Sequence, residues 1–175
     1  KQGEDADLRL YNILYEDGKW GMSSGFDGST GYGKVPDSHK FDFPQEHDFA
    51  IATWVKMPIS QSIVTNASNF LIGKNGNLSR PINENVGGEN SENQPGIISE
   101  SFVEAPNFPF ELTTFNQSSA NVGKIQIARK GGLFTPSTMT TQSFNDGNWH
   151  HVVAQRKTGS LEIYVDGRMH ASSSD

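Results

Sequence analysis

The segment of residues 144–169, FNDGNWHHVVAQRKTGSLEIYVDGRM, constrains the fold more strongly than any other part of the sequence. It holds two strand-like runs, residues 149–156 and 161–165, joined by the polar turn KTGS. In the second run, LEIYV, an apolar residue falls at every other position, which is typical of a strand with one buried face. The Asp-Gly pairs before and after the runs favour tight turns, because glycine accepts a positive φ. The segment therefore predicts a β-hairpin whose apolar face must be covered by a second sheet.

Shorter segments with strand character occur along the whole chain. Residues 49–57, FAIATWVKM, predict a central strand whose two faces are both partly apolar and therefore partly covered. No stretch shows sustained helical periodicity, and turn residues recur about every ten positions, so the sequence predicts an all-β fold, an antiparallel β-sandwich or jelly roll. Phe41 and Phe43 are expected to close one end of the core. Further strands are expected within residues 8–15, 20–23, 24–35, 69–74, 97–103, 110–115 and 124–130.

Composition limits the possible partners. A chain of 175 residues has the length of one domain, and a hydrophobic content of 34% with 18 glycines indicates long or numerous loops, above all at residues 75–95. The net charge is −6 without any basic block, so nucleic acid is not expected as a partner. No apolar run approaches the ~20 residues that cross a bilayer, so direct membrane insertion is not expected either. Cysteine is absent, which excludes disulfides and thiol chemistry.

Two blocks of sequence carry a resemblance to a known family. NDGNWHHVVAQRKTGSLEIYVDGR resembles the central hairpin of laminin G-like, concanavalin A-like jelly-roll domains, and GFDGSTGYGKVPDSHKFDFPQEHDFAIATWVKM resembles their opening strands. The resemblance implies one jelly-roll domain over residues 1–175, within a larger extracellular, cell-surface or virion-surface protein. In the family further strands follow the hairpin, so we expect the domain to be incomplete at its C-terminus, with those strands lying downstream or in a neighbouring chain.

The sequence does not favour catalysis. Glucanases of the concanavalin A-like fold carry Glu-x-Asp-x-x-Glu on one strand, and this string does not occur here. Glu100 and Glu104 share a strand parity and are the remaining candidate pair, so a glycoside hydrolase ranks last among the candidate functions. His150 and His151 are adjacent and would point to opposite faces of a strand, which favours packing over joint metal binding.

Calcium is a candidate cofactor, because it prefers carboxylate, amide and carbonyl oxygens. Asp27 lies in FDGSTGY, where the resemblance implies an acidic or amide residue, and it is the predicted metal ligand. The alternative for Asp27 is a turn residue that accepts hydrogen bonds from nearby backbone. The acidic loop at residues 83–93 is a second candidate for the metal.

Sugar binding needs an aromatic ring beside side chains that bond hydroxyl groups. Trp54, Tyr164 and Arg156 are predicted to lie off the core-facing parity, with Tyr32 on a nearby loop, and are the candidate ligand-binding residues. The alternative is that Trp54 packs in a second layer and Tyr164 is an ordinary cross-strand aromatic.

Together these observations predict a non-catalytic recognition or adhesion module that binds carbohydrate on a glycan or glycoprotein surface, with or without calcium. The alternative is a structural assembly module, which contacts neighbouring chains and binds no sugar.

Overall fold

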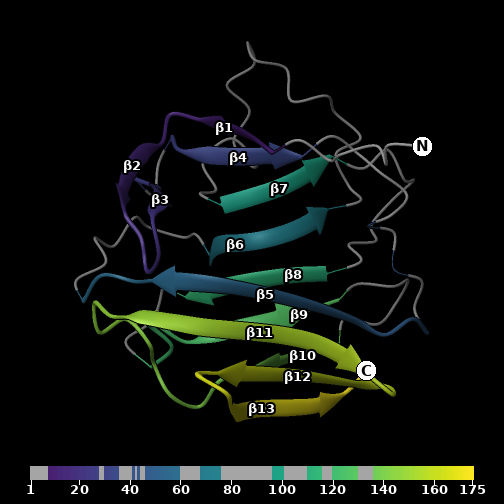
Figure 1. The fold of residues 1–175 in the computed structure, drawn as a ribbon. Coiled ribbons are helices and arrows are strands. Elements are labelled where there is room, and N and C mark those ends of the chain that lie inside the picture. Colours follow the sequence, from purple (N-terminus) through teal and green to yellow (C-terminus); the bar gives the residue numbers. More distant parts are fainter. Residues whose placement is uncertain are drawn as a thin grey trace.

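Every element that the structure assigns is a β-strand, which confirms the predicted all-β class (Figure 1). The structure is a computed structural model, and within the described residues it contains no helix long and apolar enough to cross a membrane. It describes residues 8–27, 30–35, 41, 43, 46–59, 68–75, 96–100, 110–115, 120–129 and 136–175.

The larger of two stacked sheets has seven strands in the order β1-β4-β7-β6-β8-β9-β10. Neighbours pair antiparallel except at β7, which runs parallel to both β4 and β6. The predicted antiparallel β-sandwich is confirmed, and β7 is the one strand in the described sheets that departs from antiparallel pairing. A parallel pair needs a longer connection than a tight turn, and a long stretch of chain lies between β6 and β7. The strands are β1 (Arg9–Tyr11), β4 (Tyr32–Val35), β6 (Ser68–Asn75), β7 (Gly96–Glu100), β8 (Phe110–Phe115), β9 (Ile125–Ala128) and β10 (Ser137–Met139).

The smaller sheet has four antiparallel strands in the order β13-β12-β11-β5. It contains the predicted hairpin, in which Val152 of β11 lies opposite Val165 of β12 and Thr53 of β5. Within the described residues β5 pairs with β11 alone and forms an edge of its sheet, so the prediction of a central strand is wrong. One further strand, β13, follows the hairpin within the chain. The bounds are β5 (Phe49–Lys56), β11 (Trp149–Lys157), β12 (Ser160–Val165) and β13 (Arg168–Ser174).

The core lies between the two sheets, as the alternation predicts. In β9, β11 and β12 the buried side chains fall at every second position, so these strands turn one apolar face inward. In β8 the successive residues Leu112, Thr113 and Thr114 are all buried. One end is closed by packed aromatic rings: the Phe43 ring stacks on Phe49 with centroids 4.8 Å apart and meets Phe110 at a tilt with centroids 5.5 Å apart, which confirms the predicted role of Phe43. The largest fully buried apolar residues are Leu112, Ile125 and Ile127 from the large sheet and Val152, Leu161, Ile163 and Val165 from the small sheet.

A separate two-stranded hairpin, β2 (Leu14–Asp17) and β3 (Met22–Gly25), lies at one end of the sandwich (Figure 1). The prediction of one strand over residues 8–15 is wrong, because Asn12 has a φ of 49° and turns the chain between β1 and β2. Asparagine tolerates this left-handed conformation better than most residues. The break sends β1 into the large sheet and frees β2 to form the hairpin, whose turn reaches the small sheet.

Candidate functional site

The four-stranded sheet has two chemically different faces. Its inner face packs on the core through side chains such as Ala154 and Ile163, which lie opposite each other on β11 and β12. Its outer face carries the residues of the other parity, among them Trp54, His151 and Tyr164. The outer face is the one turned toward the reader in Figure 1. The inner face thus supports the sheet on the apolar core, and the outer-face side chains are the ones that can contact a ligand.

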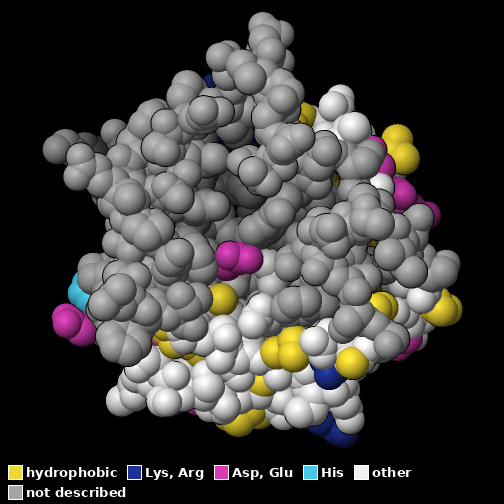
Figure 2. Space-filling model, turned by 180° about the vertical axis from the view of Figure 1, so that it is seen from behind, with side chains coloured by type: hydrophobic (Ala, Val, Ile, Leu, Met, Phe, Trp, Pro, Cys, Tyr) yellow, Lys and Arg dark blue, Asp and Glu magenta, His cyan; other side chains and the backbone are white. Residues whose placement is uncertain are grey.

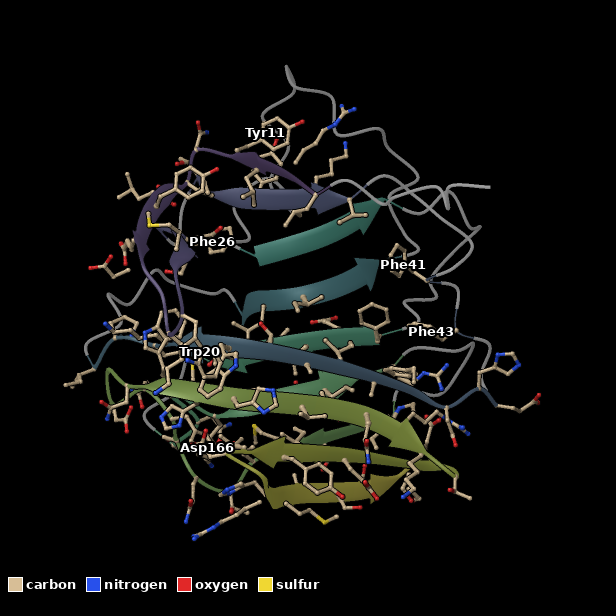
Figure 3. The ribbon with its side chains drawn as sticks, in the orientation of Figure 1. Tyr11, Trp20, Phe26, Phe41, Phe43 and Asp166 are labelled. Carbon is tan, nitrogen blue, oxygen red and sulfur yellow. The ribbon has the colours of Figure 1, made fainter. Side chains whose placement is uncertain are left out.

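An aromatic platform, defined as Trp20, Trp54 and His151, forms at one end of this outer face. Trp54 comes from β5 and His151 from the neighbouring position on β11, with ring centroids 5.1 Å apart. Trp20 comes from the turn between β2 and β3 and meets Trp54 edge to face, with centroids 4.9 Å apart and an interplanar angle of 86° (Figure 3). Trp20 is 72% exposed, although it is fixed in position by Trp54. The ammonium of Lys19 lies 5.5 Å from the Trp54 ring.

The turn that presents Trp20 is closed by its own backbone. The N–H of Gly18 donates to the carbonyl of Gly21 over 2.8 Å, and Gly21 has a φ of 69°. A residue with a Cβ atom adopts this left-handed conformation reluctantly. Glycine at this position therefore allows the tight turn that holds Trp20 over the small sheet.

A polar group, the Glu162 cluster, is defined as Gln155, Glu162 and Tyr164 and lies on the same outer face. The Oε2 atom of Glu162 accepts hydrogen bonds from Nε2 of Gln155 at 2.7 Å and from the hydroxyl of Tyr164 at 3.0 Å. The hydrogen bond to Glu162 raises the pKa of Tyr164 above its usual value, which is already well above neutral pH. The cluster holds one carboxylate in a fixed orientation.

The predicted ligand-binding residues fall into different parts of the molecule. Trp54 and Tyr164 share the outer face of the small sheet, as predicted. Tyr32 lies on β4 of the large sheet, where its ring stacks on Tyr11 at 4.7 Å, so the expectation of a loop near the other candidates is wrong. In Figure 3, Tyr11 and Trp20 lie in separate regions of the molecule. Trp54 and Tyr164 therefore share one face of the small sheet, and Tyr32 does not belong to that face.

Arg156, another predicted ligand-binding residue, lies on the inward side of the small sheet. It lies opposite Leu161, which points into the core, and so it has the inward parity. Its guanidinium bonds the carboxylate of Asp175, the carbonyl of Glu46 at 2.9 Å and Oδ1 of Asp48 at 3.0 Å. The prediction that Arg156 lies off the core-facing parity is wrong, because the register of the hairpin places it with the core residues at the end of the sandwich.

Asp27 occupies a turn. Its Oδ1 atom accepts the backbone N–H groups of Thr30 at 2.8 Å and Gly31 at 2.9 Å, and its Oδ2 atom accepts the hydroxyl of Thr30 at 2.7 Å. These bonds match the turn alternative and engage both oxygens. In the part of the chain that the structure describes, no three His, Asp or Glu side chains gather closely enough to hold a metal ion. Calcium at Asp27 therefore stays a prediction; the loop at residues 83–93 and Glu104 lie outside the described residues.

His150 forms a carboxylate clasp, defined as Asp146, His150 and Asp166. Nδ1 of His150 lies 2.7 Å from Asp166, and Nε2 lies 3.0 Å from Asp146. A neutral imidazole donates from one nitrogen only, so two carboxylate partners favour the protonated ring. Burial alone would lower the pKa of His150, but the hydrogen bonds and charges of Asp166 and Asp146 outweigh it and raise the pKa. The clasp ties the segment before β11 to the turn between β12 and β13.

Trp20, Glu162 and the clasp are functional residues that the sequence patterns did not indicate. Trp20 follows an Asp-Gly turn signal but falls inside the strand expected over residues 20–23, so periodicity does not place it at a hairpin tip. The clasp had a detectable signal: Asp146 and His150 are four residues apart, and Asp166 follows the strand that pairs with β11. The predicted packing role of the adjacent histidines agrees with the structure, in which both rings contact other aromatic rings.

These features define a class of protein: a two-layer β-sandwich domain whose small sheet carries an aromatic platform on its outer face. A family profile described as the concanavalin A-like lectin/glucanases superfamily matches residues 27–175. Because this match spans well over half of the sequence, the chain belongs to that superfamily and is a lectin-like or binding domain of the laminin G-like kind. A search of curated proteins and a search of solved structures each found no match.

Proposed function

We propose that this domain is a non-catalytic recognition module that binds glycans on the outer face of the small sheet. The observation that carries the proposal is the aromatic platform, in which a largely exposed indole, Trp20, is held in place by Trp54. The apolar CH face of a sugar ring packs on such an indole, and a preorganised ring loses little conformational entropy on binding.

Polar groups near the platform support a sugar over an apolar ligand. His151 and Lys19 both contact Trp54 and supply groups that can bond hydroxyls beside the ring. The Glu162 cluster adds a fixed carboxylate on the same face. A concentration of aromatic rings with a few oriented polar groups is the usual composition of a carbohydrate site.

The ionisation of the described carboxylates supports binding without hydrolysis. A glycosidase needs one carboxyl group with a raised pKa as its general acid. In the carboxylate clasp, hydrogen bonds from Asn148 and His150 lower the pKa of Asp146 to about 2, and the pKa of Asp166 is also lowered, although burial opposes that shift. Neither group suits the role of an acid.

Glu111 is the exception, since burial raises its pKa. It lies on β8 of the large sheet, and its register partners on either side are Gly73 and Ala128, which carry no acid. Figure 2, which views the large-sheet side, shows acidic side-chain atoms exposed near the middle of that side. One carboxyl group without a partner on the neighbouring strands does not form the pair that glycoside hydrolysis requires.

A second function, assembly with a neighbouring chain, is favoured by one observation. The β2–β3 hairpin exposes Leu14, Tyr15 and Met22, each by about two thirds of its surface. Exposed apolar groups concentrated on one element are typical of a protein contact. If the domain serves assembly alone, the platform would be covered by another chain and no glycan would bind.

The test is a glycan array probed with the wild-type chain and with two variants, Trp20→Ala and Tyr15→Ala. Tyr15 is the matched control, because it lies on the same hairpin, is 67% exposed and is not one of the rings that form the platform. We expect glycan binding by the wild type and by Tyr15→Ala, and its loss in Trp20→Ala. Binding with and without chelator decides whether calcium takes part. Failure of the wild type to bind any glycan, or equal binding by Trp20→Ala, would refute the proposal.

The proposal places the domain where glycans are displayed, at a cell or virion surface, as part of a larger protein. Glycans and glycoproteins are then its partners.

A further inference from the structure

The outer face of the small sheet offers more than the platform, because a floor of small side chains extends away from it. On β5, Ala50 and Ala52 precede Trp54 at the same parity, and both are exposed. Val153 lies opposite Ala52 and next to Tyr164, and it is partly exposed. Small side chains therefore line the outer face between the platform and the Glu162 cluster, and this strip is here called the path.

The path is long compared with one sugar ring. Trp54 and Glu162 are separated by two strand spacings across the sheet, because Trp54 lies opposite His151, and Glu162 lies opposite Gln155 on the same strand β11. They are also offset by four positions along the strand, from His151 to Gln155. With a spacing of ~4.8 Å between strands and a rise of ~3.4 Å per residue, the Cα atoms lie about 17 Å apart.

The far end of the path carries a carboxylate that is only partly used. Oε2 of Glu162 accepts both hydrogen bonds of the cluster, whereas Oε1 accepts none from the residues that the structure describes. An ionised carboxylate has about four acceptor positions, so Oε1 can accept from ligand hydroxyls. Gln155 and Tyr164 fix its orientation, which favours a ligand that brings paired O–H donors.

We infer that the ligand is a neutral oligosaccharide, a trisaccharide or longer, that lies diagonally across the small sheet. One ring stacks on the platform of Trp20 and Trp54, and a ring near the other end donates hydroxyl hydrogen bonds to Glu162. A glycan with carboxylate or sulfate groups at that end is disfavoured, because like charges repel. The inference rests on the proposed function and adds the length and charge class of the ligand.

The experiment measures binding to printed neutral gluco-, manno-, galacto- and xylo-oligosaccharides, each as a series from monosaccharide to hexasaccharide, together with sialylated and sulfated glycans. The variants are Glu162→Gln and Tyr164→Phe, which weaken or misorient the acceptor. The control is Met169→Ala, which changes an exposed outer-face residue on β13 beside the path. Unfolding midpoints establish that each variant is folded.

We expect affinity to rise steeply between the disaccharide and the tetrasaccharide. Glu162→Gln should lower affinity for the longer chains by about tenfold or more, since hydrogen bonds to charged groups are the strong ones, and should leave short chains nearly unchanged. Met169→Ala should leave all of them unchanged.

Four results would overturn the inference. One such result is equal affinity for short and long chains, and another is an unchanged affinity in Glu162→Gln while Trp20→Ala abolishes binding. Either result would contradict the extended ligand but would agree with the proposed function. A preference of the wild type for sialylated or sulfated glycans would contradict the inference that the ligand is neutral. If the wild type binds nothing on the array, the inference and the proposed function fail together.

Discussion

Replacing Asp175 by asparagine should destabilise the domain strongly, because it removes a buried charge that joins the two sheets. The carboxylate of Asp175 bonds two arginines, Arg129 at 3.0 Å and the guanidinium of Arg156. Arg129 follows β9 of the large sheet, and Arg156 belongs to β11 of the small sheet, so the carboxylate links one layer to the other. The side chains of Arg129 and Asp175 are only 6% and 3% exposed, which makes this ion pair a buried one.

The magnitude follows from that burial. Removal of one partner of a buried ion pair takes a counter-charge from the other group away from water and costs about 3–5 kcal/mol. Asn keeps the shape of Asp175 but not its charge, so we expect a loss near the lower limit, about 3 kcal/mol. With a urea dependence of about 2 kcal/mol per molar for a domain of this size, the unfolding midpoint should fall by about 1.5 M.

Asp48→Asn is the matched control, and urea unfolding followed by tryptophan fluorescence is the assay. Asp48 bonds the same Arg156 at 3.0 Å, but its side chain is 55% exposed. An ion pair in contact with solvent contributes at most about 1 kcal/mol, so this variant should lose less than about 0.5 M in midpoint. Equal losses in the two variants would show that burial of the pair does not determine its contribution, and the reasoning would be wrong.

Two further predictions concern the clasp and a tight turn. The pKa of His150 is raised in the folded chain, so His150 stabilises the fold below its unfolded pKa of about 6.5, and this stabilisation is lost as the pH rises through the folded pKa. The pKa values of Asp146 and Asp166 are lowered, so these groups stabilise the fold above about pH 4 and lose that effect at lower pH. His150→Gln should therefore remove part of the fall in unfolding midpoint between pH 6 and pH 8, and an unchanged pH profile would contradict the clasp. Gly123→Ala should lower the free energy of unfolding by well over 1 kcal/mol, because Gly123 has a φ of 77° and a Cβ atom there would lie 2.1 Å from Oδ1 of Asn145. Gly159 has a φ of 78° but open space around it, so Gly159→Ala should lower the same free energy by only about 1 kcal/mol.

Sequence patterns predicted the elements whose two faces differ most. In β12 the residues alternate between buried and partly exposed at every position, so periodicity alone located the strand and its inward face. In β2 all four residues are exposed, and no periodicity existed to separate β2 from β1. The break between them depends on the positive φ of Asn12, which a hydrophobic pattern does not register. The parallel entry of β7 likewise depends on chain connections rather than on local alternation.

The candidate site was predictable only where it lay on a regular strand. Parity along β5 and β12 placed Trp54 and Tyr164 on the outer face correctly. The prediction for Arg156 was wrong because the pairing of the two hairpin strands was not used to assign its face. Arg156 lies opposite Leu161, which points into the core, so Arg156 lies on the inward side as well. Trp20 could not be placed at all, since its position over Trp54 is a tertiary contact between a separate hairpin and the small sheet.

Recognition and stability are therefore expected to reside in different side chains, and Trp20→Ala tests this separation. Trp20 buries little more than a quarter of its surface, so its loss removes roughly 50 Å² of apolar contact and should cost about 1 kcal/mol of folding free energy. Trp54 is packed between Trp20 and His151 on the sheet itself, and Trp54→Ala should cost clearly more. If glycan binding is lost in Trp20→Ala while the unfolding midpoint falls by about 0.5 M or less, the exposed indole serves the ligand and not the fold. A fall as large as that of Trp54→Ala would mean that the hairpin is part of the structural support of the sandwich, and the platform would then have no separate role in recognition.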